Sequence, residues 1–368
     1  MALSTIIIFL LVLGVIVFVH ELGHFATAKF FGVKVEEFGL GFPPKIFGKK
    51  KGETEYTVNW IPLGGFVKIA GEDGENRDDP RSFGAKPVWQ RAIILSAGVL
   101  MNFLLAVVLF SAVFMSGFPT DVTGIQDSEI PAGSEVFVQV TDVASGSPAE
   151  ESGIKPEDKI LKAGDVEIKK VEDLQDYTKE NAGKNIEITI DRDGEIIQKE
   201  VFSRADTEGE GAIGVSLIRG AIISYSFFES IKEGFIYTAN ITVFIFQYLS
   251  QTVRELISTG GTTADVSGPV GMVSMTQQAA EMGLIVLLRF MALISVNLAV
   301  INILPLPALD GGRIFFLFIE KIKKSPVSPE LEAKIHNAGF MLLMLLMLIV
   351  TFKDVAKLGV FDKIMGIF

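Results

Sequence analysis

Residues 2–24 read ALSTIIIFLLVLGVIVFVHELGH, an apolar stretch that ends in two histidines with a glutamate between them. The run from Ala2 to Val19 carries no charge, and a helix-compatible continuation to Phe31 makes it long enough to cross a bilayer. A secretory signal peptide is the alternative, but the run lacks the basic start and the small-residue cleavage site of such a peptide. Residues 1–31 are therefore predicted to form a first transmembrane helix.

The composition of the whole chain agrees with insertion into a membrane. Its 368 residues are 49% hydrophobic and have a mean hydropathy of +0.43, which is too apolar for an ordinary soluble enzyme of this length. Three further apolar stretches follow, at 92–118, 284–309 and 335–352. The sequence thus predicts a polytopic α-helical membrane protein with four transmembrane helices.

Charge and cysteine content exclude several classes of protein. The chain has no cysteine, which excludes disulfide frameworks, thiolate nucleophiles and cysteine-based zinc sites. The net charge is −11, and the acidic residues are concentrated between Asp121 and Arg219. An acidic soluble part argues against nucleic acid as a partner.

The basic residues predict the orientation in the membrane. The cluster Lys49–Lys51 lies in the loop 32–91 between the first two spans, and more lysines and arginines lie in the loop 310–334 between the last two. Because basic loops face the cytoplasm, both loops are predicted to be cytoplasmic. The acidic segment then faces the outside, and residues 353–368 form a C-terminal tail.

Residues 121–205 have the pattern of a small α/β domain. Glu135–Val143 alternates as a strand, and two strand-like segments on either side of residues 193–194 indicate a hairpin. The stretches GSPA at 146–149 and GIKPEDKIL at 153–161 resemble bacterial PDZ domains, so we expect one inserted, extracytoplasmic PDZ-like domain. The tetrapeptide GLGF at 39–42 also occurs in PDZ loops, but it lies in the predicted cytoplasmic loop.

The segment 206–280 connects the PDZ-like domain to the third span. Residues 234–249 within it are mainly apolar, but Glu229, Lys232 and Glu233 precede them. Two interpretations remain open, an amphipathic helix at the membrane interface and a fifth span. We favour the interfacial helix, because an even number of spans keeps the predicted orientation consistent.

The chemistry lies in the motif His-Glu-x-x-His at residues 20–24. On a helix, His20 and His24 are one turn apart on the same face, so both imidazoles can bind one zinc ion. Glu21 lies beside them, in position to take a proton from zinc-bound water. Ionisable groups at membrane depth are costly and usually functional, which favours a metal site over an ordinary polar helix end.

A catalytic zinc usually has three protein ligands, so a third is needed. Asp310 ends the third apolar stretch at the same predicted membrane depth as His24, and we prefer it to the rival His336 at the start of the fourth span. Pro305 and Pro307 just before Asp310 interrupt the helix, and such irregular backbone is tolerated in a membrane only where it lines a cavity or is buried in protein.

These motifs together resemble the site-2 protease family of intramembrane zinc metalloproteases. The resemblance rests on His-Glu-x-x-His in the first span and on Asn-x-x-Pro-x-Pro-x-Leu-Asp-Gly at 302–311 in a late span. The PDZ-like insert is similar to the bacterial regulator-of-sigma-E-protease branch. The resemblance implies one Zn²⁺ per chain held by His20, His24 and Asp310, with Glu21 as catalytic base, in a multi-pass protein of the bacterial plasma membrane.

The resemblance also implies residues that hold the substrate backbone. Asn297 and Asn302 are two of them, although hydrogen bonds between helices are the alternative for both. The segment Gly64, Gly65 and Phe66 matches a membrane-associated β-hairpin at about residues 55–70, which could offer a free edge to an unwound substrate. An ordinary cytoplasmic hairpin is the alternative there.

The expected function is an endopeptidase that cuts single-span membrane proteins, such as anti-sigma factors or remnant signal peptides by resemblance. The PDZ-like domain would either bind a peptide C-terminus or exclude substrates with large outer domains. A non-catalytic membrane scaffold that binds peptide C-termini is the alternative from a different class. A metal transporter is the third, but the further acidic or histidine ligands it needs along several spans are not evident.

Overall fold

The computed structural model describes residues 3–72, 78–131, 133–192, 194–205, 211–261 and 267–357. The chain divides into two compact units. The first consists of Met1–Val113 together with Glu229–Phe368, and the second of Phe114–Phe228. The second unit is therefore an insertion into the first.

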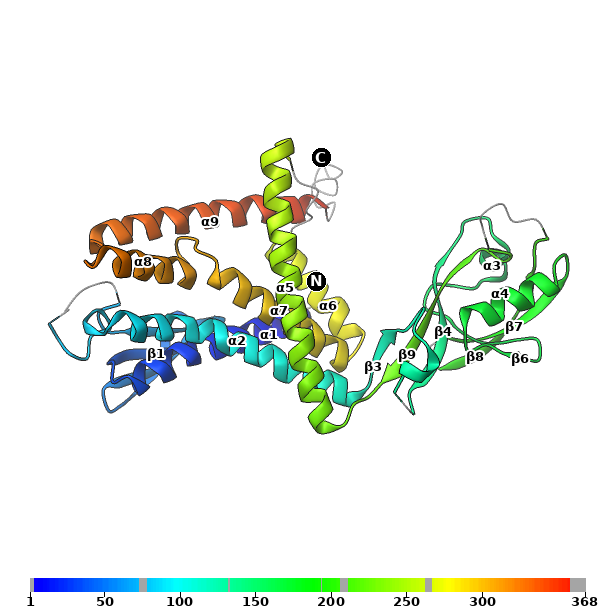
Figure 1. Ribbon diagram of the computed structural model, residues 1–368, viewed down its shortest axis with the longest axis horizontal. Helices are drawn as coiled ribbons and strands as arrows, with labels where there is room; N and C mark the ends of the chain where they lie inside the picture. Colours follow the sequence, from blue (N-terminus) through cyan, green and yellow to red (C-terminus); the bar gives the residue numbers. More distant parts are fainter. Residues whose placement is uncertain are drawn as a thin grey trace. The chain divides into compact units, whose positions relative to one another are not determined.

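Four helices among the described residues are long and apolar enough to cross a membrane, as predicted (Figure 1). They are α1 (Leu3–Phe30), α2 (Val88–Ser116), α7 (Leu284–Ile303) and α9 (Pro329–Lys357). Helices satisfy all of their backbone groups internally, which the bilayer requires. Exposed apolar side chains cover the outer faces, most completely on α9, where Leu342, Leu345 and Leu348 are all exposed.

Small residues bring α1 and α2 close together. A Cβ atom at Gly23 of α1 would collide with the main-chain oxygen of Ala97 on α2, so the two backbones are in direct contact at this point. Transmembrane helices associate by such close packing, since lipid offers no hydrophobic driving force. The contact lies at the level of the His-Glu-x-x-His motif.

The loop between α1 and α2 forms a curled two-strand sheet of β1 (Val35–Lys51) and β2 (Thr54–Ile69). Phe38 of β1 pairs with Val67 on one side and with Tyr56 on the other, so the first half of β1 lies between the two halves of β2. The prediction of a hairpin at about 55–70 is therefore wrong in one detail. Its two strand segments lie on either side of β1 and pair with β1 instead of with each other. The sequence 39–42 lies in β1, outside the unit that carries the PDZ-like segment.

The inserted unit is a mixed α/β domain with a seven-stranded sheet in the order β3-β9-β4-β5-β7-β8, and β6 pairs with β5. Its elements are β3 (Phe118–Asp121), β4 (Glu135–Val143), α3 (Pro148–Ser152), β5 (Lys159–Ala163), β6 (Val166–Glu167), α4 (Val171–Glu180), β7 (Asn185–Arg192), β8 (Glu195–Phe202) and β9 (Val215–Ile223). The core includes Ile160, Ile188, Ile190 and Leu174, which are almost fully buried.

The inserted unit extends beyond the predicted range 121–205. Strand β9 follows that range in sequence and pairs with both β3 and β4 inside the sheet.

The interior of this unit also holds an ion pair, in which Arg192 donates to the buried Asp158 at 2.6 and 2.7 Å. Burial opposes ionisation of Asp158, but the hydrogen bonds from Arg192 and from the main-chain nitrogen of Lys155 outweigh it and lower the pKa of the carboxyl group.

Three further helices belong to the first unit: α5 (Phe227–Thr259), α6 (Pro269–Glu281) and α8 (Asp310–Lys323). The predicted segment 234–249 lies inside α5, which is not among the four helices apolar enough to span a membrane. The loop predicted at 310–334 contains α8, whose apolar face contributes Leu317 to the core beside α2. The last part of the predicted C-terminal tail, residues 358–368, lies outside the described residues.

Candidate metal centre

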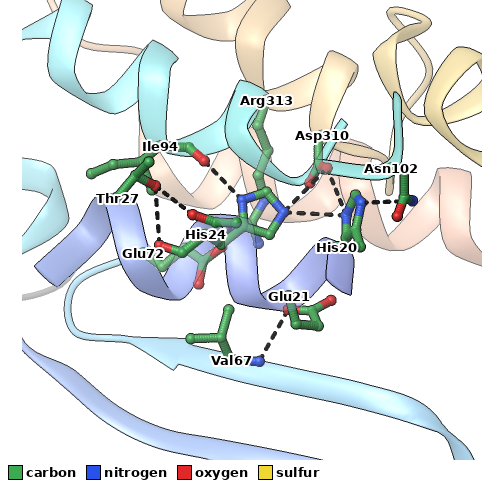
Figure 2. Close-up of polar contacts among 11 residues, drawn as sticks. His20, Glu21, His24, Thr27, Val67, Glu72, Ile94, Asn102, Asp310 and Arg313 are labelled. Atoms are coloured by element: carbon green, nitrogen blue, oxygen red, sulfur yellow. Dashed lines mark hydrogen bonds and ion pairs between the residues drawn. The ribbon is translucent and has the colours of Figure 1, made fainter. Parts of the chain in front are cut away.

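Helix α1 places His20 and His24 one turn apart on its buried face, toward α2. Each histidine is only 6% exposed. Their Nε2 atoms lie 3.2 Å apart and point to the same spot, as Figure 2 shows. The i, i+4 spacing of the motif thus produces two convergent imidazole nitrogens.

Asp310 completes the cluster from the far end of the sequence. Its Oδ2 atom lies 3.1 Å from Nε2 of His20 and 3.4 Å from Nε2 of His24. The three ligand atoms lie within 4.8 Å of one another, which makes this group a candidate metal site. Imidazole nitrogen and carboxylate oxygen are ligands that zinc accepts, and three of them leave a fourth position open, as in catalytic zinc sites.

A break between α7 and α8 positions Asp310. Helix α7 ends at Ile303 instead of continuing to 309, because Pro305 and Pro307 cannot extend it. Ala308 then adopts a positive φ of 73°, and α8 begins at Asp310 itself. The turn brings the backbone of Gly311 and Gly312 so close to the preceding carbonyl groups that a Cβ at either position would collide with them.

His336, the rival third ligand, lies outside the cluster. Its Nδ1 atom accepts a hydrogen bond of 2.9 Å from the main-chain nitrogen of Ala308. His336 therefore fixes the turn that carries Asp310 and does not itself face His20 and His24.

Two observations test whether a metal ion fits this cluster. Oδ2 of Asp310 is buried and has no hydrogen-bond partner among the described residues. A Cβ atom built on Gly98 of α2 would collide with Nε2 of His24 and would lie 2.8 Å from Nε2 of His20, so the glycine leaves open the space between these nitrogens. A buried carboxylate oxygen that forms no hydrogen bond, beside two imidazole nitrogens and an open space, fits a bound cation.

Glu21 lies on the side of α1 that faces β2. Its Oε2 atom accepts a hydrogen bond of 3.1 Å from the main-chain nitrogen of Val67 (Figure 2). Val67 belongs to the second half of β2, which pairs with β1 on its other side. The second half of β2 therefore has one edge paired with β1, and its other edge, which is not paired with β1, lies beside Glu21.

The predicted residues Gly64, Gly65 and Phe66 lie on this strand beside the motif. Gly64 has a positive φ of 96°, and a Cβ there would lie 2.6 Å from Cβ of Val17 on α1. A Cβ on Gly65 would lie 3.9 Å from Cγ of Glu21. Gly64 thus lets β2 run directly along α1, whereas a Cβ on Gly65 would collide with the main-chain oxygen of Gly39 on β1. The ring of Phe66 stacks on Phe42.

Asn297 and Asn302, the other predicted substrate residues, lie on α7. Asn297 is exposed, and its Nδ2 donates to the main-chain oxygen of Leu293 in the same helix at 2.8 Å. Asn302 is half-buried in the last turn of α7. Among the described residues, neither side chain forms a hydrogen bond to another helix, so the interhelical alternative gains no support.

Ion pairs hold α8 in place around the cluster. Arg91 of α2 is buried and donates to Glu320 of α8 at 3.0 and 2.5 Å. Arg313, one turn after Asp310, is paired with Glu72 just after β2. Because these partners are more than 200 positions apart, the sequence carries no local sign of them.

Sequence reasoning also missed three residues of α2 that contact the histidines. The main-chain oxygen of Ile94 lies 2.8 Å from Nδ1 of His24, and Nδ2 of Asn102 lies 3.3 Å from Nδ1 of His20. Gly98 lies between these two positions. The only hint in the sequence is weak: a glycine, Gly98, and a polar amide side chain, Asn102, lie four residues apart in an apolar span.

Comparison with known proteins agrees with this geometry. The profile of peptidase family M50 matches residues 8–346. A Clostridium perfringens protein, whose name places it among the zinc metalloproteases, is 38% identical over 350 residues, with 95% of this chain and 98% of that protein covered. The regulator of sigma-W protease RasP of Bacillus subtilis is 32% identical, with 97% of this chain and the whole relative covered. The zinc metalloprotease RasP of Oceanobacillus iheyensis is 30% identical, with 96% and 99% covered. From the paired motifs, the four apolar helices and these similarities, the chain belongs to peptidase family M50, the site-2 protease type of zinc metalloprotease.

Proposed function

We propose that this protein is an endopeptidase that cuts the membrane-spanning segments of single-span membrane proteins. The observation that carries the proposal is the convergence of His20, His24 and Asp310 beside Glu21 and an open strand edge. The cluster joins α1, which is apolar enough to span a membrane, to the turn that follows α7, another such helix. A peptide bond presented there is at or near membrane depth.

His20, His24 and Asp310 would hold one zinc ion per chain. Bound zinc supplies a Lewis acid and makes its water acidic enough to lose a proton near neutral pH. Glu21 accepts the proton of the water that attacks the scissile carbonyl carbon, and it delivers that proton to the leaving amine nitrogen. The N–H of Val67 orients the Glu21 carboxylate before substrate enters.

The substrate must be unwound before it is cut, since a helix keeps its carbonyl groups in internal hydrogen bonds. The open edge of β2 at Gly64, Gly65 and Phe66 offers main-chain partners to an extended segment. Because Gly64 has no side chain, this strand lies directly against α1 beside Glu21. Asn297 and Asn302 supply additional amide groups on α7 for the substrate backbone.

We place the protein in the bacterial plasma membrane with the metal centre toward the cytoplasm. The lysines at 49–51 support this orientation, and the acidic inserted unit then lies outside. Outside, the inserted PDZ-like unit would bind a peptide C-terminus or exclude bulky substrates. One relative is named a regulator of sigma-W protease, which supports anti-sigma factors as a substrate class.

The decisive experiment compares purified wild type with Glu21→Gln on a model single-span substrate, each with and without a chelator. We expect cleavage by the metal-loaded wild type alone, with the variant reduced by at least about 10²-fold while it still binds zinc. Gel analysis with mass spectrometry of the products measures both rate and cut site. Cleavage by Glu21→Gln, or a peptide-binding wild type that cuts none of several substrates, would favour the non-catalytic scaffold.

A further inference from the structure

His24 shows how this protein sets the proton positions in its metal site. Its Nδ1 atom lies 2.8 Å from the main-chain oxygen of Ile94, and a carbonyl oxygen can only accept a hydrogen bond. Nδ1 of His24 therefore carries the hydrogen, and Nε2 keeps its lone pair for a metal. The hydrogen-bond partner of Nδ1 thus decides whether Nε2 of the same histidine can bind a metal ion.

His20 has a different partner at the same place. Its Nδ1 atom lies 3.3 Å from Nδ2 of Asn102, and Asn102 is completely buried in α2 (Figure 2). With this amide orientation the nitrogen donates to His20, so the hydrogen of the imidazole must be on Nε2, where it blocks metal binding. The same orientation leaves Oδ1 of Asn102 buried without a hydrogen-bond partner among the described residues.

Turning the amide of Asn102 by half a rotation changes the proton positions at His20. The oxygen and nitrogen of an asparagine amide have nearly the same shape, so the two orientations are assigned by their hydrogen bonds. In the turned orientation Oδ1 accepts from the Nδ1–H of His20, and Nε2 of His20 then has a free lone pair. Both histidines would present the same form to the metal.

The arrangement of α2 supports a common design for the two histidines. Ile94, Gly98 and Asn102 are spaced four residues apart and therefore form one stripe on α2. Ile94 holds His24, Asn102 holds His20, and Gly98 between them leaves the space for the ion. Ser295 of α7 donates to the main-chain oxygen of Asn102 at 2.8 Å, which fixes α2 at this level.

We propose that Asn102 is a positioning residue of the metal centre, whose Oδ1 accepts from Nδ1 of His20 and so keeps Nε2 of His20 available to zinc. This inference rests on the zinc site of the proposed function. Outer partners of this kind orient a ligating histidine, and their loss typically weakens metal binding by about 10- to 100-fold. Asn102 would act through His20 without touching the substrate.

The test measures zinc binding, which is independent of cleavage. Full-length wild type, Asn102→Leu, Asn102→Asp and Ser295→Ala are purified in detergent, and zinc dissociation constants are obtained by competition with a chelator of known affinity. Leucine has a similar size but accepts no hydrogen bond, and we expect it to weaken zinc binding by about 10- to 100-fold. Aspartate keeps the acceptor, and we expect it to remain close to wild type. Ser295→Ala is the matched control, because it loosens α2 from α7 but leaves the partner of His20 in place.

Melting temperatures with and without zinc separate positioning from a structural role. A positioning residue reduces the stabilisation that zinc confers and leaves the zinc-free melting temperature nearly unchanged. If Asn102→Leu does not fold, Asn102→Ala is measured in the same way.

Wild-type zinc affinity in the leucine or alanine variant would overturn the inference. Equal weakening in Asn102→Leu and Ser295→Ala, or in Asn102→Leu and Asn102→Asp, would also overturn it. The proposed function fails differently, because there the wild type itself would bind no zinc or cut no substrate.

Discussion

At the residue scale, Gly98 matters to the candidate metal centre because it has no side chain to fill the space beside the two histidines. The nearest atoms to a Cβ at this position are Nε2 of His24 and two ring atoms of His20. Gly23 of α1 has a related role, since it allows the backbone contact with Ala97. The two histidines therefore reach one point only because glycines occupy both facing helices.

Replacing Gly98 by alanine is expected to abolish the metal site. The added methyl group displaces the imidazoles, and a shift of about 1 Å at a reactive centre can lower the rate by about 10²-fold. Zinc content by elemental analysis and cleavage of a single-span substrate are the two measurements.

Gly14→Ala is the matched control for this substitution. Gly14 lies in α1 and has no atoms within 4 Å of its built Cβ among the described residues, so its variant should bind zinc and cut like wild type. A Gly98→Ala protein with full zinc content and activity would contradict the proposed location of the ion.

At the element scale, the break between α7 and α8 gives Asp310, the candidate third ligand, its position. If the helix were continuous, Asp310 would lie in an extension of α7 along the same axis. The turn at Pro305–Leu309 instead redirects the chain before α8 begins. Ala308 in the left-handed region is costly for a residue with a Cβ, and the hydrogen bond from its nitrogen to His336 helps to hold it there. Residue 336 thus acts on the site through the backbone of the turn.

Replacing His336 by phenylalanine is expected to slow cleavage by about 10- to 100-fold, because the ring remains but the acceptor for Ala308 is lost. Single-turnover cleavage rates and zinc content measure the effect. The exposed neighbour Asn337 offers a control, since Asn337→Ala should retain wild-type rates. Full activity of His336→Phe would show that the prolines alone hold the turn.

At the scale of the whole molecule, a membrane unit carries the candidate metal centre, and a second unit is inserted in the sequence between α2 and α5. The α/β unit has its own buried core and its own internal ion pair of Asp158 with Arg192. Such a module has the features of an independently folded domain.

The proposed orientation predicts that the loop 32–91 and the inserted domain are exposed on opposite sides of the membrane. The chain has no cysteine, so single cysteines at exposed positions can be labelled without background. In intact cells, a membrane-impermeant maleimide should label Glu195→Cys in the inserted unit and leave Lys50→Cys unlabelled until the membrane is opened. Labelling of Lys50→Cys in intact cells would reverse the orientation, and labelling of both would contradict four spans with one inserted external domain.

The sequence alone determined the four membrane helices and the pairing of His20 with His24. Both depend on local patterns, because a membrane helix makes its hydrogen bonds within its own segment and residues i and i+4 of a helix share a face. Strand Glu135–Val143 was likewise readable from local alternation. Asp310 was preferred to His336 from the sequence because it ends the third apolar stretch at the same predicted membrane depth as His24.

Only the tertiary structure decided which residues meet across the sequence. It brought Asp310 to the histidines, gave Gly98 and Asn102 their neighbours, and placed β9 inside a sheet that had been predicted to end earlier. It also inserted β1 between the two halves of β2, where a simple hairpin was expected. These contacts depend on packing between distant segments, which local composition does not encode. The stretch 2–24 therefore specifies two side chains of the candidate metal site, and the fold supplies the third side chain and the space between them.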